Sequence, residues 1–362
     1  MSKLCSEKEL RKSLVKKKIC LLTAFFLMIC LPFSMAGTFA DKAKERKQQR
    51  DEEKVAAEQA KTGVVTCSLT HQGLKRTYDV HVPPSYNGKT SVPLVMVFHG
   101  GGGNAKNTCK QSGMNEKADQ EGFIVVYPQG TGKERLGKMQ GSWNSGAIGG
   151  GEAYKKNIDD IGFINQMLDQ LEAQYNIDKD RVYSTGISMG GMISYRLGCE
   201  ASERIAAIAP VSTALVTEPC APERPVPVLH FQGTDDRMIP YQGGKSDSTL
   251  PKKVVVGGVY PSTREVISFW TQKDRCPATS QVTYKKGDVT CETYGPCAGN
   301  SEVTLCTIQG GGHTWPGTKV EIKKSWLNKI LGKTTQDISA TDTMWEFFKR
   351  HPRSKTDTSS SI

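Results

Sequence analysis

The stretch Thr185-Gly186-Ile187-Ser188-Met189-Gly190-Gly191-Met192 decides the fold. It contains the pattern G-x-S-x-G, directly after a strand-like run at 182–185 and before an amphipathic helical pattern. A strand-to-helix turn that pushes a serine hydroxyl into a cleft has no room for Cβ atoms two residues before and after it, and Gly186 and Gly190 meet that constraint. The alternative, a glycine-rich turn without chemistry, does not explain the flanking strand and helix. The sequence therefore predicts Ser188 as a nucleophile at the start of a helix, whose dipole would favour a nearby oxyanion.

A serine nucleophile needs a base, and the base needs an orienting carboxylate. His313 is the best base candidate, because it lies in a glycine-rich loop at 309–317 after the predicted strand 303–308. The other histidines have plainer expected roles: His71 and His81 lie in the N-terminal strand region, where exposed or edge histidines are common, His230 lies inside an apolar strand, and His351 lies in a terminal helix. Hydrolases with this turn have the chain order Ser, Asp, His. Asp235 and Asp236, after the predicted strand 226–231, both fit that order, and spacing alone does not separate them.

A second glycine run, His99-Gly100-Gly101-Gly102-Gly103-Asn104, follows the predicted strand 94–98. Because glycine has no side chain, its backbone N–H group is accessible and can stabilise the oxyanion of a tetrahedral intermediate. We assign this role to the N–H groups of Gly101 and Met189. A phosphate-binding loop is the rival interpretation, but the run lacks the G-K-[ST] ending.

The rest of the chain shows apolar strand-like runs in alternation with helical stretches. Runs at 94–98, 123–127, 181–185 and 226–231 suit strands buried on both faces. Residues 161–171 have helical apolar spacing in a pattern that ends near Asn176, and Met344, Trp345 and Phe348 mark another helix. This alternation predicts an α/β fold with a mainly parallel sheet and helices on both faces.

The composition excludes a disordered or collagen-like chain and allows one large domain or two small ones. The chain has 362 residues, 37% of them hydrophobic and 23% charged, with a formal net charge of +11. Residues 1–18 carry +5 of this charge and residues 19–40 carry none. The excess charge therefore does not by itself indicate a nucleic-acid partner, and the remaining basic residues form no known binding motif.

The N-terminal residues have the order of a secretory signal peptide: a basic lead, an apolar run from Ile19 to Leu31, and then small residues. We expect a signal peptide at 1–36, with cleavage after Ala36 or Ala40, or alternatively an uncleaved membrane anchor. No lipid anchor is expected. A charged spacer is predicted at 41–62, one catalytic domain at 63–352 and a flexible polar tail at 353–362.

The predicted export determines the oxidation state expected for the eleven cysteines. Three belong to the leader, which leaves eight in an oxidising compartment, where disulfides are expected. A zinc site is disfavoured, because no pair has CxxC spacing. The expected pairs are Cys291 with Cys306 across a hairpin, Cys199 with Cys220, Cys276 with Cys297, and Cys67 with Cys109.

From about residue 63 to residue 352 the chain resembles the secreted α/β-hydrolase esterases of the polyhydroxybutyrate depolymerase family and the related feruloyl and acetylxylan esterases. In the family pattern the catalytic aspartate stands three residues after a glycine, which selects Asp236. The resemblance implies Ser188 as nucleophile, His313 as general base and then acid, Asp236 as its orienter, and ester hydrolysis through an acyl-enzyme with no cofactor. It is carried by His99-Gly100-Gly101-Gly102-Gly103, Asp159-Asp160-Ile161-Gly162-Phe163, Arg181-Val182-Tyr183 with Gly186-Ile187-Ser188-Met189-Gly190-Gly191-Met192, Gly233-Thr234-Asp235-Asp236 and Gly311-Gly312-His313-Thr314-Trp315-Pro316-Gly317.

Two departures from the family bear on the substrate. Only about ten residues follow the last predicted helix, where depolymerases of solid polymer commonly append a binding module, so soluble oligomers or small esters are favoured over granules. An insertion at 320–331, with Ile322, Trp326 and Ile330 on one helical stripe, is expected to be a lid, a membrane-surface helix, or a helix packed on the domain. Trp143 and Trp315 are candidates for an acyl or aromatic pocket, with loop packing as the alternative.

The sequence as a whole predicts a secreted serine esterase, extracellular or periplasmic, that acts on poly(3-hydroxybutyrate) or its oligomers. Feruloyl or acetylxylan esters are the alternative substrates. A second hypothesis is a serine peptidase of similar fold. The non-enzymatic hypothesis is an exported polymer-binding protein built on an inactive hydrolase scaffold. The expected partner is an ester substrate. No nucleic-acid partner is expected. Association with a membrane is expected only through an uncleaved N-terminal segment.

Overall fold

The computed structural model describes residues 63–135, 138–146, 151–251, 258–320 and 325–353. These residues belong to one compact unit, Glu58–Ile362, separate from a unit Met1–Ala57. The predicted signal peptide, the charged spacer and residues 354–362 of the predicted tail lie outside the described residues.

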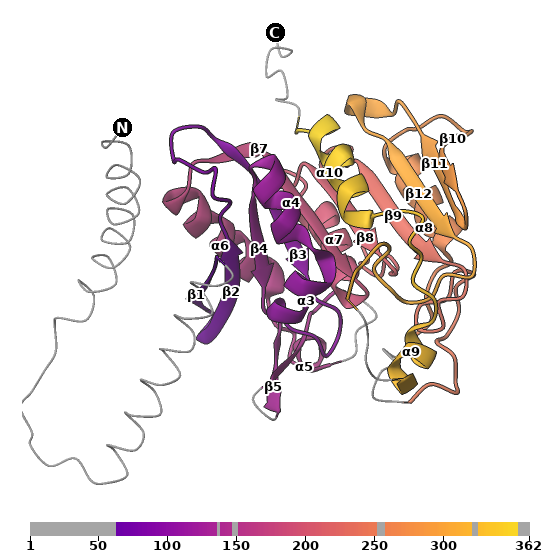
Figure 1. Cartoon of the computed structure of the whole chain (residues 1–362), viewed down its shortest axis with the longest axis horizontal. Helices are drawn as coiled ribbons and strands as arrows, with labels where there is room; N and C mark the ends of the chain where they lie inside the picture. The colour runs from indigo at the N-terminus through magenta and orange to yellow at the C-terminus, as the bar shows by residue number, and fades with distance from the viewer. Residues whose placement is uncertain (1–62, 136–137, 147–150, 252–257, 321–324, 354–362) are drawn as a thin grey trace, which may run out of the picture. The chain divides into compact units, whose positions relative to one another are not determined.

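A ten-stranded sheet forms the centre of the described unit (Figure 1). Its spatial order is β1-β2-β4-β3-β7-β8-β9-β12-β11-β10. The six strands from β4 to β12 are parallel to one another, and an antiparallel hairpin flanks them on each side. The strands are β1 (Val64–His71), β2 (Leu74–His81), β3 (Val92–Phe98), β4 (Ile124–Pro128), β7 (Ile177–Ile187), β8 (Ala207–Val211), β9 (Val228–Gly233), β10 (Gln281–Lys286), β11 (Val289–Tyr294) and β12 (Val303–Ile308). The four runs predicted as strands buried on both faces correspond to β3, β4, β7 and β9, and these predictions are confirmed.

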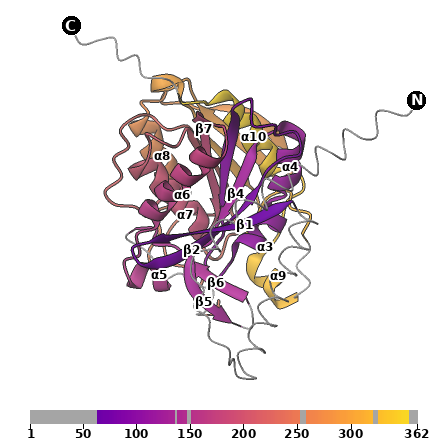
Figure 2. The same cartoon turned by 90° about the vertical axis from the view of Figure 1, so that its left-hand side faces the viewer.

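Helices cover both faces of the sheet, as the alternation predicts. Figure 2 shows α6, α7 and α8 on one side of it and α3, α4 and α10 on the other. Each set contributes apolar side chains to a separate core. The helices are α3 (Ala105–Ser112), α4 (Met114–Glu121), α5 (Glu152–Lys155), α6 (Asp160–Gln174), α7 (Met189–Glu200), α8 (Thr263–Lys273), α9 (Ser325–Leu331) and α10 (Ala340–Arg350), with a 3₁₀ turn η1 at Ala298–Asn300.

A small ribbon outside the main sheet was not predicted. Strands β5 (Thr131–Arg135) and β6 (Lys138–Ser142) pair with each other in a separate two-stranded sheet. In both views the ribbon and α9 lie at the same end of the molecule (Figures 1 and 2). Gly141 therefore lies in a strand, and Trp143 follows directly after its end at Ser142.

Three of the four expected disulfides form: Cys199–Cys220, Cys276–Cys297 and Cys291–Cys306. The last pair joins residues directly opposite each other on β11 and β12. The expected bond between Cys67 and Cys109 is wrong, since both thiols are free. The sheet separates them: Cys67 packs against the core beneath α6 and α7, and Cys109 against the core beneath α3 and α10.

Two further expectations need correction. His81 is buried, because β2 is not an edge strand but pairs with both β1 and β4. In the insertion, Ile330 is buried while Trp326 is 47% exposed, so the two do not share one buried stripe. Ile322 lies outside the described residues.

Candidate active site

The proposed serine, carboxylate and histidine follow three strands of the parallel sheet. Ser188 comes directly after β7, Asp236 follows β9, and His313 follows β12. Because β7, β8, β9 and β12 are adjacent and parallel, their carboxyl ends meet at one edge, which is where ligands bind in such sheets. Backbone hydrogen bonds join the loops there: Ser188 N–H donates to the Val211 carbonyl (2.9 Å), and Asp235 N–H donates to the Gly311 carbonyl (2.9 Å).

The turn at Ser188 has the tight geometry that the sequence predicts. Ser188 has φ 59° and ψ −125°, a left-handed conformation that a non-glycine residue adopts rarely and at an energetic cost. A Cβ at Gly186 would approach the Gly190 carbonyl oxygen to 2.5 Å, and a Cβ at Gly190 would collide with the Phe98 carbonyl. Helix α7 begins at Met189. The predicted strand, turn and helix are therefore confirmed, and the two glycines are required by backbone packing.

His313 and Asp236 form a buried hydrogen-bonded pair. His313 Nδ1 lies 2.8 Å from Asp236 Oδ2, and the residues are 5% and 3% exposed. The carboxylate also accepts the N–H groups of Met238 and Ile239 at its other oxygen, both at 2.9 Å. With Nδ1–H donated to this carboxylate, Nε2 of His313 is the nitrogen left to accept a proton.

The geometry separates the two competing aspartates. Asp235 is exposed, and its carboxylate accepts only from the neighbouring Thr234 hydroxyl, at 3.2 Å, among the hydrogen bonds of the described residues. Asp236 is buried and contacts His313. The structure thus brings the expected histidine together with Asp236 and not with Asp235.

The side chains of Ser188 and His313 are not hydrogen-bonded to each other in the structure. Within the described part of the chain, neither the Ser188 hydroxyl nor His313 Nε2 has a hydrogen-bond partner. Ser188 itself is only 6% exposed. Such bonds are often long in ligand-free enzymes and shorten when substrate binds.

The glycine loop lies against the serine turn. A Cβ at Gly100 would be 3.3 Å from the Ser188 Cβ, and one at Gly101 would be 3.3 Å from Met189 Cε. Helix α3 begins at Ala105 and is capped by the Asn104 side chain, which accepts the Asn107 N–H. The loop that carries the Gly101 N–H is therefore packed directly beside the turn that carries the Met189 N–H.

The two candidate pocket tryptophans have different positions. Trp143 is fully buried; its Nε1–H donates to the His99 carbonyl (2.9 Å), and its ring packs edge-on against Phe98. Trp143 therefore lies beneath the glycine loop, as in the packing alternative. Trp315 is 1% exposed and donates to the Thr341 hydroxyl, but its rim contributes to the wall of a cavity.

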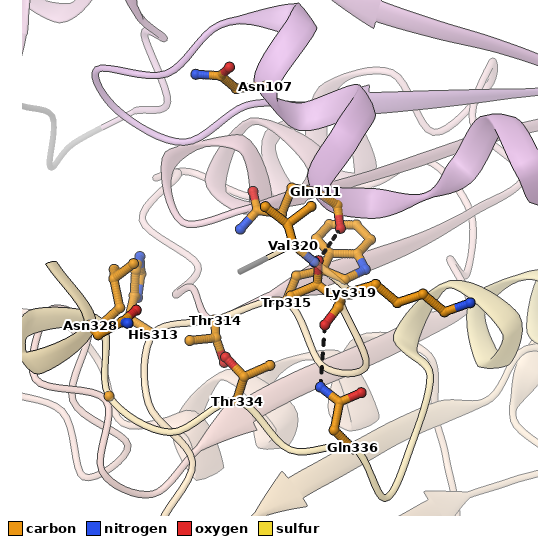
Figure 3. A pocket seen from close by; sticks show the side chains of 13 residues that line it. Asn107, Gln111, His313, Thr314, Trp315, Lys319, Val320, Asn328, Thr334 and Gln336 are labelled. Atoms are coloured by element: carbon orange, nitrogen blue, oxygen red, sulfur yellow. Dashed lines mark hydrogen bonds between the residues drawn. The ribbon is translucent and has the colours of Figure 1, made fainter. Parts of the chain in front are cut away.

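That cavity, of about 580 Å³, opens beside His313 (Figure 3). Its walls come from α3, the histidine loop and the end of α9. Among the described lining residues amide and hydroxyl side chains predominate, and Lys319 is the one Lys, Arg, Asp or Glu. The lining residues are Asn107, Gln111, His313, Thr314, Trp315, Thr318, Lys319, Val320, Asn328, Leu331, Gly332, Thr334 and Gln336.

One residue that supports the pair was missed from the sequence. Gln232, fully buried in β9, donates from Nε2 to Asp236 Oδ2 (3.1 Å) and to the Ile239 carbonyl (2.9 Å). It therefore fixes the carboxylate from the strand side. The sequence does contain a signal for this role, because Gln232 is a polar residue in a mostly apolar strand, four residues before Asp236.

Two other buried histidines predict a pH dependence of stability. Burial lowers the pKa of both His99 and His230 from 6.5 to about 4. Between these values the unfolded chain binds protons that the folded chain does not, so lowering the pH through this window destabilises the fold. We expect a loss of about 3 kcal/mol per histidine between pH 6.5 and pH 4.

Urea unfolding at several pH values measures this loss. His230 accepts or donates hydrogen bonds with Tyr195 and Gln232, so the uncharged variant His230→Gln keeps polar atoms at the site. This variant should show a shallower fall of the free energy of unfolding with pH. An unchanged slope would contradict the expectation.

No helix in the described ranges is long and apolar enough to span a membrane.

The central parallel sheet with helices on both faces has the α/β-hydrolase fold. The crystal structure of native pOPH shares this fold: it matches 80% of this chain and 87% of its own length, with a TM-score of 0.50 and 16% identity. The family model described as esterase PHB depolymerase matches residues 76–225, which include the glycine loop and Ser188.

Two relatives extend the match. Feruloyl esterase B of Piromyces equi is 31% identical over 65% of this chain and 42% of its own length. The bifunctional acetylxylan esterase/xylanase XynS20E of Neocallimastix patriciarum is 29% identical over 68% of this chain and 32% of its own length. The chain thus spans less than half the length of these relatives. Over these ranges it is similar to polyhydroxybutyrate depolymerases, feruloyl esterases and acetylxylan esterases.

Proposed function

We propose that the protein is an exported serine esterase that hydrolyses carboxylic esters through an acyl-enzyme. The observation that carries this proposal is the buried pair of His313 and Asp236 at the same sheet edge as the tight turn of Ser188. The similarity of residues 76–225 to the esterase PHB depolymerase model and of the chain to feruloyl esterase B supports it. The three disulfides and the predicted signal peptide support export.

The reaction follows from the roles of these groups. Ser188 Oγ attacks the ester carbonyl while His313 Nε2 takes the hydroxyl proton, and Asp236 stabilises the resulting imidazolium. The N–H groups of Gly101 and Met189 hold the oxyanion. His313 then gives its proton to the departing alcohol, which leaves an acyl group on Ser188. A water molecule, deprotonated by His313, attacks this ester, and the acid leaves as Ser188 regains its proton.

The cavity beside His313 favours one substrate class. Its amide and hydroxyl side chains both donate and accept hydrogen bonds, as the hydroxyls of a sugar do. A hydroxyalkanoate chain offers mainly carbonyl acceptors and methyl groups. We therefore propose esters of a neutral, hydroxyl-rich carrier, such as feruloylated or acetylated plant cell-wall sugars, as the substrates. Oligomers of 3-hydroxybutyrate are the second candidate, which the matching family model favours.

A panel of ester substrates tests both the proposed esterase activity and the proposed substrate class. The panel contains p-nitrophenyl acetate, methyl ferulate, acetylated xylan and a 3-hydroxybutyrate trimer, and the readout is kcat/KM for each. We expect acetylated xylan to exceed the trimer by about tenfold or more, since each well-made set of hydrogen bonds to the sugar hydroxyls contributes on the order of 1 kcal/mol. Methyl ferulate, which has no sugar hydroxyls, reports on the acyl group alone. A preference for the trimer would establish the second candidate instead. Failure to hydrolyse any of the four would reject the esterase.

A further inference from the structure

The glycine loop at 99–104 is held by a buried histidine of defined tautomer. His99 is fully buried, and its Nε2 accepts the Gly130 N–H at 2.9 Å. Because Nε2 must be an acceptor, the ring proton is on Nδ1, from which it is donated to the Gly100 carbonyl at 2.8 Å. The imidazole is therefore neutral and fixes the direction of that carbonyl.

The same bond sets the direction of the Gly101 N–H. The Gly100 carbonyl and the Gly101 N–H belong to one planar trans peptide, in which the C=O and N–H bonds point in opposite directions. With the carbonyl turned toward His99, the N–H is turned away from it. Ser188 and Met189 pack closely on this part of the loop. The Gly100 carbonyl also accepts the Gly103 N–H (2.9 Å), so the His99 ring and this turn together hold the peptide that carries one proposed oxyanion donor.

Gln129, at the end of β4, contacts both ends of this loop. Its Nε2 lies 3.1 Å from His99 Nε2, and its Oε1 accepts the N–H of Ala105, the first residue of α3, at 3.1 Å. Two glycines leave the space for this arrangement. A Cβ at Gly141 would lie 2.5 Å from Gln129 Nε2, and a Cβ at Gly130 would lie 3.1 Å from the His99 ring.

The β5–β6 ribbon holds the loop from the same side. Gly102 N–H donates to the Gly141 carbonyl (2.8 Å), and Gly141 N–H donates to the Gly103 carbonyl (2.9 Å). Just after the ribbon, Trp143 bonds to the His99 carbonyl through its indole and to Met189 Sδ through its backbone N–H. Gly141 and Trp143 thus contact the backbone of the glycine loop and the side chain of Met189, whose N–H is the other proposed oxyanion donor.

We propose that Gln129 is a positioning residue for the oxyanion hole: its amide holds the His99 ring and the start of α3, and so fixes the direction of the Gly101 N–H. This inference rests on the proposed esterase function. Gln129 touches no reacting atom and acts only through the loop.

The variant Gln129→Leu tests the proposal, because it removes the hydrogen bonds to His99 and Ala105, together with one to the Gly130 carbonyl (3.2 Å), while it keeps a side chain of similar bulk. Loss of a whole oxyanion donor costs about 100- to 1000-fold in rate. For a misdirected donor we expect kcat for p-nitrophenyl acetate to fall about 10- to 100-fold, with KM within about twofold of wild type. The number of active enzymes is measured by labelling with a fluorophosphonate to completion, and kcat is expressed per labelled serine.

A second variant, Gln129→Glu, distinguishes positioning of the glycine loop through His99 from a general contribution to the stability of the fold. The new carboxylate still accepts the Ala105 N–H but cannot donate to His99 Nε2, and its charge favours a protonated imidazole. A proton on Nε2 would displace the Gly130 N–H and turn the ring. The acidic limb of the kcat–pH profile should therefore move to higher pH in this variant.

The matched control is Gln120→Leu, at an exposed position of α4 away from the glycine loop, which should keep the wild-type kcat, KM and pH profile. If Gln129→Leu lowers only the melting temperature and keeps kcat per labelled serine, Gln129 is merely structural and the proposal is overturned. An unshifted pH profile in Gln129→Glu would also overturn it. A wild-type protein that hydrolyses no ester would instead reject the proposed function, which keeps the two failures distinct.

Discussion

Replacing Ser188 with alanine is expected to lower kcat for p-nitrophenyl acetate by about 10⁴-fold or more, because no other group at the sheet edge is placed to form the acyl-enzyme. The fold should remain intact, since the serine side chain makes no hydrogen bond to the described residues. Hydrolysis rates and the near-ultraviolet circular dichroism spectrum measure the two effects. The variant should also fail to react with a fluorophosphonate.

Variant Ser184→Ala provides a matched control for this experiment. Ser184 lies on the same strand, fully buried, and its hydroxyl donates to Ser194 and not to any group of the proposed site. It should retain fluorophosphonate labelling and esterase activity. If Ser188→Ala kept more than about one hundredth of the wild-type rate, the nucleophile assignment would be wrong.

Replacing Asp236 with asparagine is expected to lower kcat by about 10⁴-fold, the scale of the effect when the orienting carboxylate of such a triad becomes an amide. The amide can donate a hydrogen bond to His313 Nδ1, which favours the tautomer with its proton on Nε2. A proton on Nε2 prevents that atom from accepting the Ser188 proton. Steady-state kinetics at pH 7 to 8, with KM reported separately, measure the effect.

The neighbouring aspartate supplies the comparison for this variant. Asp235→Asn changes an exposed carboxylate outside the pair and should stay within about twofold of wild-type kcat. Equal losses in the two variants would mean that the loop as a whole, and not the contact of Asp236 with His313, supports activity.

The sequence predicted those parts of the molecule in which one local rule decides the structure. The G-x-S-x-G turn is such a case, because backbone packing against Phe98 excludes any side chain at Gly190. The buried strands β3 and β9 are others, since a short continuous apolar run has no other stable environment. Cys291 and Cys306 were paired correctly because a hairpin places them opposite each other.

Features that depend on long-range packing were not predictable in this way. The choice between Asp235 and Asp236 depends on which carboxylate faces His313, and only the family pattern selected Asp236, the residue that lies 2.8 Å from it. The free thiols of Cys67 and Cys109 reflect the faces of the sheet on which they lie. The roles of Gln129 and Gln232 are set by hydrogen bonds to distant segments that a single sequence does not reveal.

The positions of the three disulfides also give export a role in assembly. All three bonds fall between Cys199 and Cys306, in the later part of the chain, which supplies Asp236 and leads to His313. The earlier part supplies the glycine loop and Ser188 without any cross-link in the described residues. During synthesis the nucleophile therefore emerges first, without a base, and the strands that bring the base are cross-linked only in an oxidising compartment. Under the proposed export and esterase function, the catalytic groups would thus be brought together fully only after the protein has left the compartment in which it is made.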